Sequence, residues 1–448
     1  MLHTLLTHTP IFYLVQSLWR DEAFSILAAE RPLGFIVSRL GFEPPVYYAM
    51  LHFWIRIFGE SEIATRSLSL LGLVLATIII IRWSEHMFKK HWLAWFTPLF
   101  FILNPMLLYY AFEVRTYGWY MFFATASLYA YSHKKWFWFT TSAILGFYTH
   151  TYFMFHLTAI GIHWLVFDVW KRSHTWKSIT RDTAFKSFLT IGFAMAPWLI
   201  KIIQEASRLK NSWYYPVDLH LVYSLLGNMF TGYEGTPWYG WTYTKYLSIL
   251  LLLFGVLAYR DSKEKRRNLL FLFCVGIPLG LCVGISFIKP LFVNRYLVST
   301  TIALVLVVIA AIQSIRNATV QKICAASLLA LVIGINWWFP QQHAKLPIRE
   351  TMNSINSIRK TTDVYFAATP IIYLEVKYYA SDRSRVYLYN PTDGVFPWYI
   401  GDAIISANDM AKDLPMYPTR AFLIRDDGSY EIVYRMPITN TTIVPRKK

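Results

Sequence analysis

Four short segments bring carboxylate, arginine and aromatic side chains together in a chain that is otherwise poor in charge. They are Trp19-Arg20-Asp21-Glu22, Glu43-Pro44-Pro45-Val46-Tyr47-Tyr48, Glu113-Val114-Arg115-Thr116-Tyr117 and Asn294-Arg295-Tyr296. A positioned carboxylate can remove the proton of an attacking hydroxyl group. The planar fork of arginine suits bidentate binding of a phosphate. Together these residue types predict transfer chemistry on a phosphate-linked substrate at a membrane surface.

Each segment also has a purely structural interpretation. The adjacent acidic pair of the first segment would stabilise the start of a helix, and the Pro-Pro pair of the second would mark another helix start. Glu113 and Arg115 are two positions apart, so on a helix they would point away from each other and pair elsewhere. Arg295 would anchor the chain at lipid headgroups. No segment is decisive alone.

The elements that must position these residues are membrane helices. Of the 448 residues, 55% are hydrophobic and only 15% are charged, whereas soluble domains carry about 25% charged residues. This excludes a soluble, disordered or fibrous protein. A span needs about 20 apolar residues, and we predict about eleven. They are 4–18, 66–84, 92–109, 116–132, 136–149, 151–168, 184–203, 246–259, 268–287, 297–314 and 323–338.

Two of these spans are ambiguous. Residues 136–149 and 151–168 would alternatively form one bent span, which would invert everything after it. The first span is short, which suggests that the chain begins late or that a longer reading frame exists.

The basic residues follow a membrane topology. The formal net charge is +17. With the N-terminus inside, the predicted cytoplasmic loops hold 17 basic and 5 acidic residues, a balance of +12, which agrees with the positive-inside rule. Nucleic-acid binding is therefore unnecessary to explain the charge, and we expect no nucleic-acid partner. Eleven spans place the C-terminus outside, and all four chemical segments fall on that outer side.

Residues 340–448 differ in composition from the chain before them. Charges return there, with 14 basic and 11 acidic residues. A helix is expected at about 348–360, and the stretches 363–367 and 420–424 alternate like strands between Pro and Asp/Gly turns. We therefore predict a mostly α protein: a polytopic transmembrane bundle over 1–339 and a small extracytoplasmic α/β domain over 340–448.

The combination resembles the GT-C superfamily of membrane glycosyltransferases, in the branch of protein O-mannosyltransferases and the aminoarabinose transferase ArnT, and most of all the bacterial RgtA/B/C/D-like group. The matching motifs are Trp19-x-Asp21-Glu22-Ala23, Pro44-Pro45-x-Tyr47-Tyr48, Phe58-Gly59-x-x-Glu62-x-x-x-Arg66, Tyr110-x-x-Glu113-x-Arg115-x-Tyr117 and Pro290-x-x-x-x-Arg295-Tyr296. The resemblance covers roughly residues 15–315. The Asp-Glu and Pro-Pro pairs are its more specific motifs.

The resemblance implies an inverting transfer of a sugar from a polyprenyl-phosphate donor to an acceptor hydroxyl on the extracytoplasmic face. It implies Asp21 as the catalytic base, while Glu22 would orient the loop or the acceptor. It implies that Arg115 and Arg295 bind the donor phosphate. The supporting residues would be Glu113, Tyr117 and Tyr296.

One position departs from the family. ArnT-like members carry a basic residue before the Pro-Pro pair, where this chain has Glu43. Glu43 is therefore expected to bind the acceptor or a metal instead of phosphate. The carboxylates of the first three segments would suit Mg²⁺ or Mn²⁺, and relatives differ in metal use, so no cofactor is assigned. His150 and His156 lack same-face spacing and are interpreted as core or interface residues.

Two other functions stay open. A transporter or flippase of lipid-linked sugars would have a similar composition, although the paired interrupted spans typical of transporters are not seen. An inactive GT-C-like scaffold is the second alternative. The expected partners are a lipid-linked sugar donor, membrane lipids and a glycan, lipid or protein acceptor. The sugar, the acceptor and the oligomeric state are not determined by the sequence.

Overall fold

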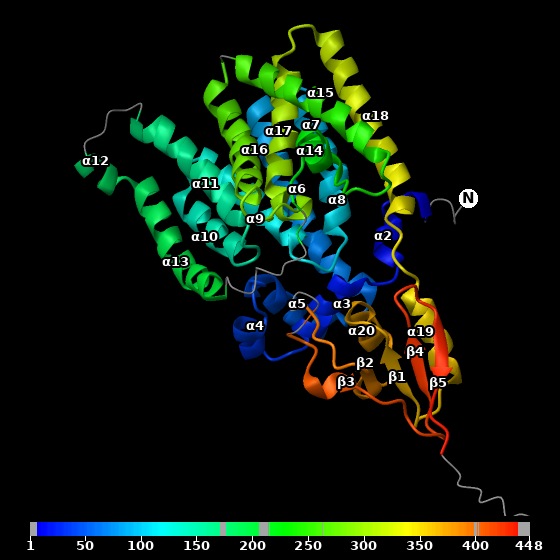
Figure 1. The fold of residues 1–448 in the computed structure, drawn as a ribbon. Helices are drawn as coiled ribbons and strands as arrows, with labels where there is room; N and C mark the ends of the chain where they lie inside the picture. Colours follow the sequence, from blue (N-terminus) through cyan, green and yellow to red (C-terminus); the bar gives the residue numbers. More distant parts are fainter. Residues whose placement is uncertain are drawn as a thin grey trace, which may run out of the picture. The chain divides into compact units, whose positions relative to one another are not determined.

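The computed structural model describes residues 7–170, 176–205, 214, 216–261, 263–397, 401 and 403–437. Most of them are helical (Figure 1). The helices up to residue 342 are α2 Ile11–Val15, α3 Arg20–Ala29, α4 Leu33–Arg39, α5 Pro45–Phe58, α6 Glu62–Phe88, α7 Leu93–Ile102, α8 Pro105–Ala111, α9 Tyr117–Ser132, α10 Trp136–Phe147, α11 Phe153–Trp164, the π-helix η1 Leu165–Trp170, α12 Trp176–Arg181, α13 Thr183–Glu205, α14 Leu219–Thr231, α15 Gly240–Arg260, α16 Lys265–Ser286, the 3₁₀ turn η3 Asn294–Leu297, α17 Val298–Ser314 and α18 Ala318–Gln342.

The chain divides into two compact units. The first, called the helical unit, contains Met1–Val15 and Ala29–Ala344, and the second, called the small unit, contains Gln16–Ala28 and Lys345–Lys448. We predicted a membrane domain over 1–339 and a second domain over 340–448. In the structure, the segment that carries Asp21 groups with the small unit although it lies more than 300 positions away in the sequence.

Seven helices are long and apolar enough to cross a membrane: α6, α11 with η1, α13, α15, α16, η3 with α17, and α18. The pair α7 and α8, bent by 51°, adds an eighth if it counts as one span. A polytopic helical architecture is thus confirmed, with seven or eight candidate spans in the described residues against about eleven predicted. Helices α9 and α10 cover two of the predicted spans, but they have 16 and 12 residues, fewer than the roughly 20 that a span needs.

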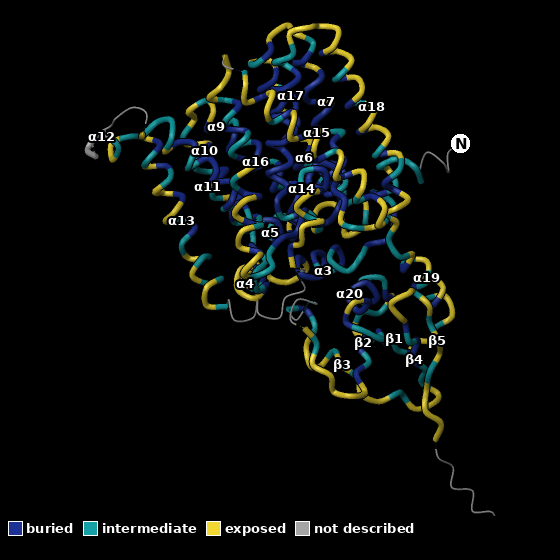
Figure 2. The backbone as a smooth tube through the Cα atoms, turned by 45° about the horizontal axis from the view of Figure 1, so that its top comes forward, coloured by how far each residue is buried: buried dark blue, intermediate teal, exposed yellow. Residues whose placement is uncertain are grey.

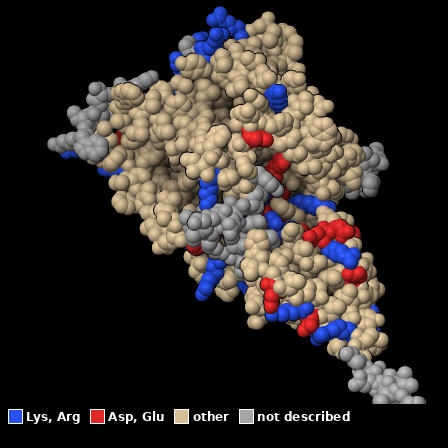
Figure 3. Space-filling model, viewed as in Figure 1, with Lys and Arg blue, Asp and Glu red and all other residues tan. Residues whose placement is uncertain are grey.

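Helix α17 forms the centre of the helical unit. Every residue from Val298 to Ile312 is buried, because this helix is apolar all round and packs against α9, α15 and α16. Figure 2 shows its tube dark along nearly its whole length. The visible flank of the bundle in Figure 3 is almost free of charge, while Lys and Arg gather at its upper end. This distribution suits a surface in contact with lipid.

Two glycines fix the crossing of α6 and α9. A Cβ on Gly118 would lie 1.9 Å from the backbone oxygen of Ser69, and one on Gly72 would lie 2.3 Å from the backbone carbonyl of Gly118. Only glycine permits backbones to approach so closely. Since the loop before α9 carries Arg115, this contact holds that loop against α6.

The small unit contains a five-stranded sheet of order β3-β2-β1-β4-β5. Its elements are α19 Ile348–Ile358, β1 Val364–Ala367, α20 Pro370–Tyr379, η4 Arg383–Arg385, β2 Val386–Tyr389, η6 Ala407–Asp409, β3 Met410–Ala411, β4 Ala421–Ile424 and β5 Tyr430–Val433. Strand β1 pairs in parallel with β2 and β4, and β4 pairs antiparallel with β5. The predicted helix at 348–360 and the strands at 363–367 and 420–424 are confirmed as α19, β1 and β4.

Candidate functional site

Arg115 is part of a closed hydrogen-bonded triangle in the helical unit. Its Nη2 donates to Oε1 of Glu43 at 3.0 Å, and its Nη1 donates to the hydroxyl of Tyr48 at 3.1 Å. The same hydroxyl donates to Oε2 of Glu43 at 2.9 Å. Arg115 is 6% exposed, whereas the side chain of Glu43 is 32% exposed, so these charge-assisted bonds are partly shielded from water. Glu43 is therefore the counter-ion of Arg115.

Local sequence explains why these three residues meet. The second proline of the Pro-Pro pair is the first residue of α5 and leaves no helical N–H unsatisfied there. Glu43 therefore lies just before the helix and Tyr48 in its first turn. Arg115 lies in the turn before α9, and its backbone oxygen accepts a hydrogen bond from Ser69 on α6 at 3.1 Å. The structural interpretation of the Pro-Pro pair is correct, and it also serves the site.

Arg295 has its own carboxylate partner. Its Nη1 donates to both oxygens of Glu234, at 2.8 and 3.1 Å. Next to this pair, Asn294 Nδ2 donates to the backbone oxygen of Tyr233 at 2.6 Å, which fixes the loop after α14 against η3. Sequence analysis missed Glu234. The available signal was that it is the only acidic residue between positions 219 and 260.

His150 connects the two arginine pairs electrostatically. Its ring stacks on Tyr120 at 5.1 Å and lies 5.0 Å from the ring of Tyr296 and 6.0 Å from that of Tyr117. Burial, together with the charges of Arg115 and Arg295, lowers the pKa of His150 to about 3. The imidazole is therefore neutral at physiological pH, and it can accept or donate a hydrogen bond without adding charge.

The structure thus brings together three of the predicted segments. The rings of Tyr117 and Tyr296 lie next to His150, and the charges of Arg115 and Arg295 both act on its imidazole. His156, interpreted like His150 as a core residue, is buried beside Ser127 at 3.1 Å. Glu113 is also buried, and its backbone oxygen accepts from the N–H of Arg115 at 2.7 Å.

The fourth segment lies in the small unit, where Asp21 and Glu22 differ sharply. Asp21 keeps 18% of its side chain exposed, and its Oδ1 accepts from Nε of Arg20 at 2.9 Å. Glu22 is 0% exposed; its Oε2 accepts from the backbone N–H of Trp19 at 3.3 Å and from Lys345 Nζ at 2.8 Å. Glu22 therefore caps α3 and binds α3 to Lys345. Asp21 is the member of this pair that solvent or a substrate can reach.

A second carboxyl group, Glu375 on α20, meets the start of α3. It is buried and accepts a hydrogen bond from the backbone N–H of Arg20. One turn further along α20, the hydroxyl of Tyr379 accepts from the N–H of Leu18 at 2.8 Å. Burial raises the pKa of Glu375 to about 8; Arg20 lowers it, and the adjacent acidic pair of α3 raises it further. Helix α20 therefore satisfies backbone donors at the base of the helix that carries Asp21.

Among the described residues, no group of three or more His, Cys, Asp or Glu side chains is arranged to hold a metal ion. The carboxylates that we considered as metal ligands have other partners in the structure. Glu22 is bonded to Lys345, Glu43 to Arg115 and Asp21 to Arg20. From the sequence we expected Glu43 to bind either a metal or the acceptor. In the structure Glu43 forms an ion pair with Arg115.

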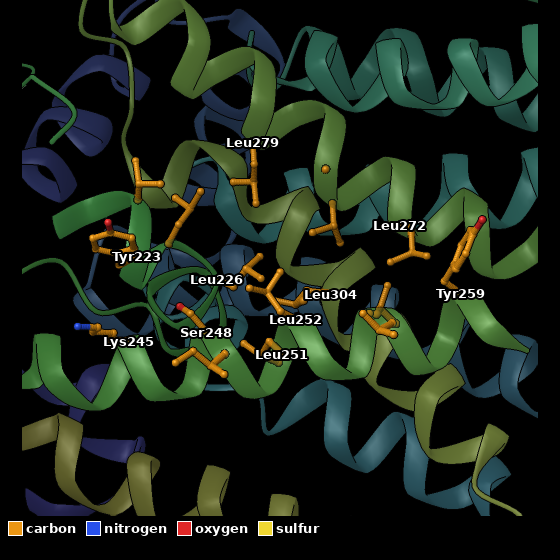
Figure 4. Close-up of a pocket in the computed structure, with 18 residues that line it drawn as sticks. Tyr223, Leu226, Lys245, Ser248, Leu251, Leu252, Tyr259, Leu272, Leu279 and Leu304 are labelled. Carbon is orange, nitrogen blue, oxygen red and sulfur yellow. The ribbon is translucent and has the colours of Figure 1, made fainter. Parts of the chain in front are cut away.

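An apolar cavity of 730 Å³ lies between α14, α15, α16 and α17. Figure 4 shows Leu226, Leu252 and Leu304 among the side chains that line it. Two of its walls belong to α14, which precedes Glu234 in the sequence, and α17, which follows Arg295. The cavity is therefore apolar, and two of its wall helices are adjacent in sequence to the residues of an ion pair.

No family model matches the chain, and no curated protein matches its sequence. Solved structures do match, and they show that the chain has a GT-C-like fold. Two of the matching structures are those of ArnT from Cupriavidus metallidurans. The form bound to undecaprenyl phosphate has a TM-score of 0.61 at 11% identity, covering 94% of this chain and 92% of that one. The apo form has a TM-score of 0.58 at 10% identity, covering 92% and 91%. At this identity the likeness is one of fold, and the protein O-mannosyltransferase branch stays a prediction.

Proposed function

We propose that this protein is an integral-membrane inverting glycosyltransferase. It transfers a sugar from a polyprenyl-phosphate donor to an acceptor hydroxyl on the extracytoplasmic side. The observation that carries the proposal is a pair of buried arginines, Arg115 and Arg295, whose charges both act on the neutral His150 in a chain with a GT-C-like fold. Both arginines bind carboxylates, so each guanidinium group already faces an anionic partner. A donor phosphate is also an anion that arginine binds through charge-assisted hydrogen bonds.

In this mechanism Asp21 is the base. The acceptor oxygen attacks the anomeric carbon of the donor, the bond from that carbon to the phosphate oxygen breaks, and the hydroxyl proton passes to the Asp21 carboxylate. Of the two adjacent carboxylates, Asp21 is the partly exposed one, while Glu22 is fully buried in an ion pair. This difference in exposure favours Asp21. A positioned base contributes about 10²–10⁴-fold to such a step.

The arginines stabilise the phosphate that leaves. As the bond to the sugar breaks, negative charge builds on the phosphate oxygens, and a fixed guanidinium group placed there costs no reorganisation. In the absence of donor, Glu43 and Glu234 balance the two arginine charges. We propose that the donor's isoprenoid chain occupies the apolar cavity between α14 and α17, because α17, which forms one wall of that cavity, directly follows the turn that carries Arg295.

A transfer assay tests this proposal. The purified protein is given undecaprenyl-phosphate sugars labelled in the sugar, together with an envelope extract as acceptor. Labelled product that depends on Asp21 is the expected result. Comparative mass spectrometry of surface glycans with and without the gene then identifies the acceptor.

The same protein in liposomes separates the alternatives. Movement of a labelled lipid-linked sugar between leaflets without any transfer would contradict the proposed enzyme function and indicate a flippase. Donor binding with neither transfer nor movement would indicate an inactive scaffold.

A further inference from the structure

A second polar cavity lies in the helical unit, away from the residues described above. It has a volume of 790 Å³, within the range of about 300–1,000 Å³ that small-molecule sites occupy. Its walls come from the ends of α6, α9 and η1 and the starts of α10, α13 and α16. Helix α9 begins next to Arg115 and reaches this cavity at its other end. Sixteen residues of α-helix span about 24 Å, so the cavity is distinct from the arginine site.

Some charged side chains around the cavity form ion pairs, and others do not. Arg266 pairs with Asp168 at 2.5 Å, and Arg267 pairs with Glu264 at 3.4 Å. Among the described residues, neither Lys89 nor Lys134 forms an ion pair. Asp182 also lines the cavity and, among the described residues, forms no ion pair. The lining therefore has four basic and three acidic side chains, and Lys89 and Lys134 are its cations without an ion-pair partner in the described part of the chain.

Lys89 and Lys134 also share an unusual backbone. Their φ angles are +50° and +55°, and only one other non-glycine residue in the described chain has a positive φ. Each follows the end of a helix, α6 and α9, where glycine is the usual residue at positive φ. The helix ends lie side by side, because the rings of His86 and His133 are 5.2 Å apart. Two lysines thus hold strained positions at one rim, where such strain often marks a functional site.

Three tryptophans also contribute to the walls. Trp83, Trp136 and Trp164 line the cavity together with the lysines. Indole side chains prefer the membrane–water interface, and basic pockets between membrane helices at that depth bind anionic lipid headgroups. Every wall helix that passes the membrane-span test places only its end here, which puts the cavity at headgroup depth.

We propose that this cavity binds the phosphate headgroup of an anionic membrane phospholipid, with Lys89 and Lys134 as its cationic contacts. The site is separate from the transfer reaction. The acyl chains lie along the uncharged flank of the bundle, while the phosphate enters the cavity between the ends of α6 and α9. A zwitterionic lipid binds less well, because its ammonium group opposes the lysines.

Native mass spectrometry of the full chain tests this site. The protein is offered phosphatidylglycerol and phosphatidylcholine with identical acyl chains. We expect phosphatidylglycerol to be retained preferentially, and Lys89→Gln with Lys134→Gln to reduce its retention at least about five-fold. The matched control, Arg316→Gln with Lys322→Gln, removes one charge just before α18 and one in its first turns, and leaves retention unchanged.

A second pair of variants keeps the test informative if the glutamines impair folding. Lys89→Gly with Lys134→Gly removes both charges and suits the positive φ angles, so this protein folds at least as well and still loses phosphatidylglycerol. Retention that survives millimolar inorganic phosphate assigns the lipid as the ligand; loss of the lipid under phosphate overturns that assignment in favour of a soluble phosphate ligand. Equal retention of both lipids, or equal loss in the lysine and control variants, overturns the site.

Discussion

Glu43 and Arg115 lie 72 positions apart in the sequence and form an ion pair of 3.0 Å. This pair explains the one departure from the family pattern. Where ArnT-like sequences carry a basic residue, this chain carries the counter-ion of an arginine. Arg295 is engaged in the same way, with Glu234.

Removing the charge of Glu43 tests whether it is a counter-ion or a base. Glu43→Gln keeps an acceptor for Tyr48 but leaves Arg115 with more positive potential for a phosphate. We expect the KM for the donor to fall or stay unchanged, with kcat largely retained, because the substitution removes the counter-ion of Arg115 and not a group that takes part in proton transfer. Steady-state kinetics measures both. A collapse of kcat by two orders of magnitude would instead identify Glu43 as the base.

Lysine should not restore full donor use when it replaces Arg115 or Arg295. Lysine offers one point charge where arginine offers a planar fork, so Arg115→Lys and Arg295→Lys should weaken donor use, and the alanine variants should do worse. Arg82→Lys, at a residue whose side chain is 77% exposed, is the matched control and should behave as wild type. Donor titration of the folded variants measures the effect. Full activity of either alanine variant removes that arginine from the phosphate role.

Substitutions of Asp21 and Glu22 should have different effects on activity and stability. Asp21→Asn removes the proton acceptor at a partly exposed position and should lower transfer at least about 10²-fold with a normal unfolding midpoint. Glu22→Gln breaks a buried ion pair with Lys345, which costs about 3 kcal/mol when one partner stays charged. We therefore expect Glu22→Gln to lower the unfolding midpoint, with residual activity in the folded fraction. Near-normal transfer by Asp21→Asn would reject Asp21 as the base.

The stability of the small unit should depend on Glu375. Its pKa is raised from 4.5 to about 8, so between these values the folded state holds a proton that the unfolded state has lost. Stability from this group is then greatest below pH 4.5 and falls as the pH rises to about 8, by a total of order 4 kcal/mol. Glu375→Gln should flatten this slope. Thermal unfolding from pH 5 to 8 measures it, and an identical slope in both proteins would contradict the protonated state.

The crossing of α6 and α9 offers a stability test in the helical unit. Gly118→Ala would force its Cβ against the backbone of Ser69, and overpacking of this kind costs about 1–3 kcal/mol or more. Because the same contact holds the Arg115 loop, transfer should fall with stability. Gly280→Ala is the matched control, since nothing lies within 4 Å of a Cβ there. An unfolding midpoint for Gly118→Ala equal to that of the control would show that the helices can separate without cost.

The predicted topology can be checked with reporters. The loop charge balance of +12 places the C-terminus outside. A reporter that is active only outside the cytoplasm should therefore work when fused after Lys448. Activity of a cytoplasmic reporter there would contradict the odd number of spans and would favour one bent span over residues 136–168.

The sequence by itself determined the membrane class, the small α/β region and the residues that carry charge near the helix ends. These follow from composition and local periodicity, because an apolar run of sufficient length has few alternatives to a membrane helix. Strands β1 and β4 and helix α19 were predictable for the same reason. The Pro-Pro pair likewise predicted the start of α5.

Only the tertiary structure decided which charges are partners. Glu43 meets Arg115, Glu234 meets Arg295, and Glu22 meets Lys345 across separations of 72, 61 and 323 positions. No local pattern specifies such pairs, because they depend on how helices cross and on which loops those crossings bring together. The same reason applies to Asp21 and Glu22: adjacent in sequence and identical in charge, they differ in role because packing buries one carboxylate and leaves the other partly exposed.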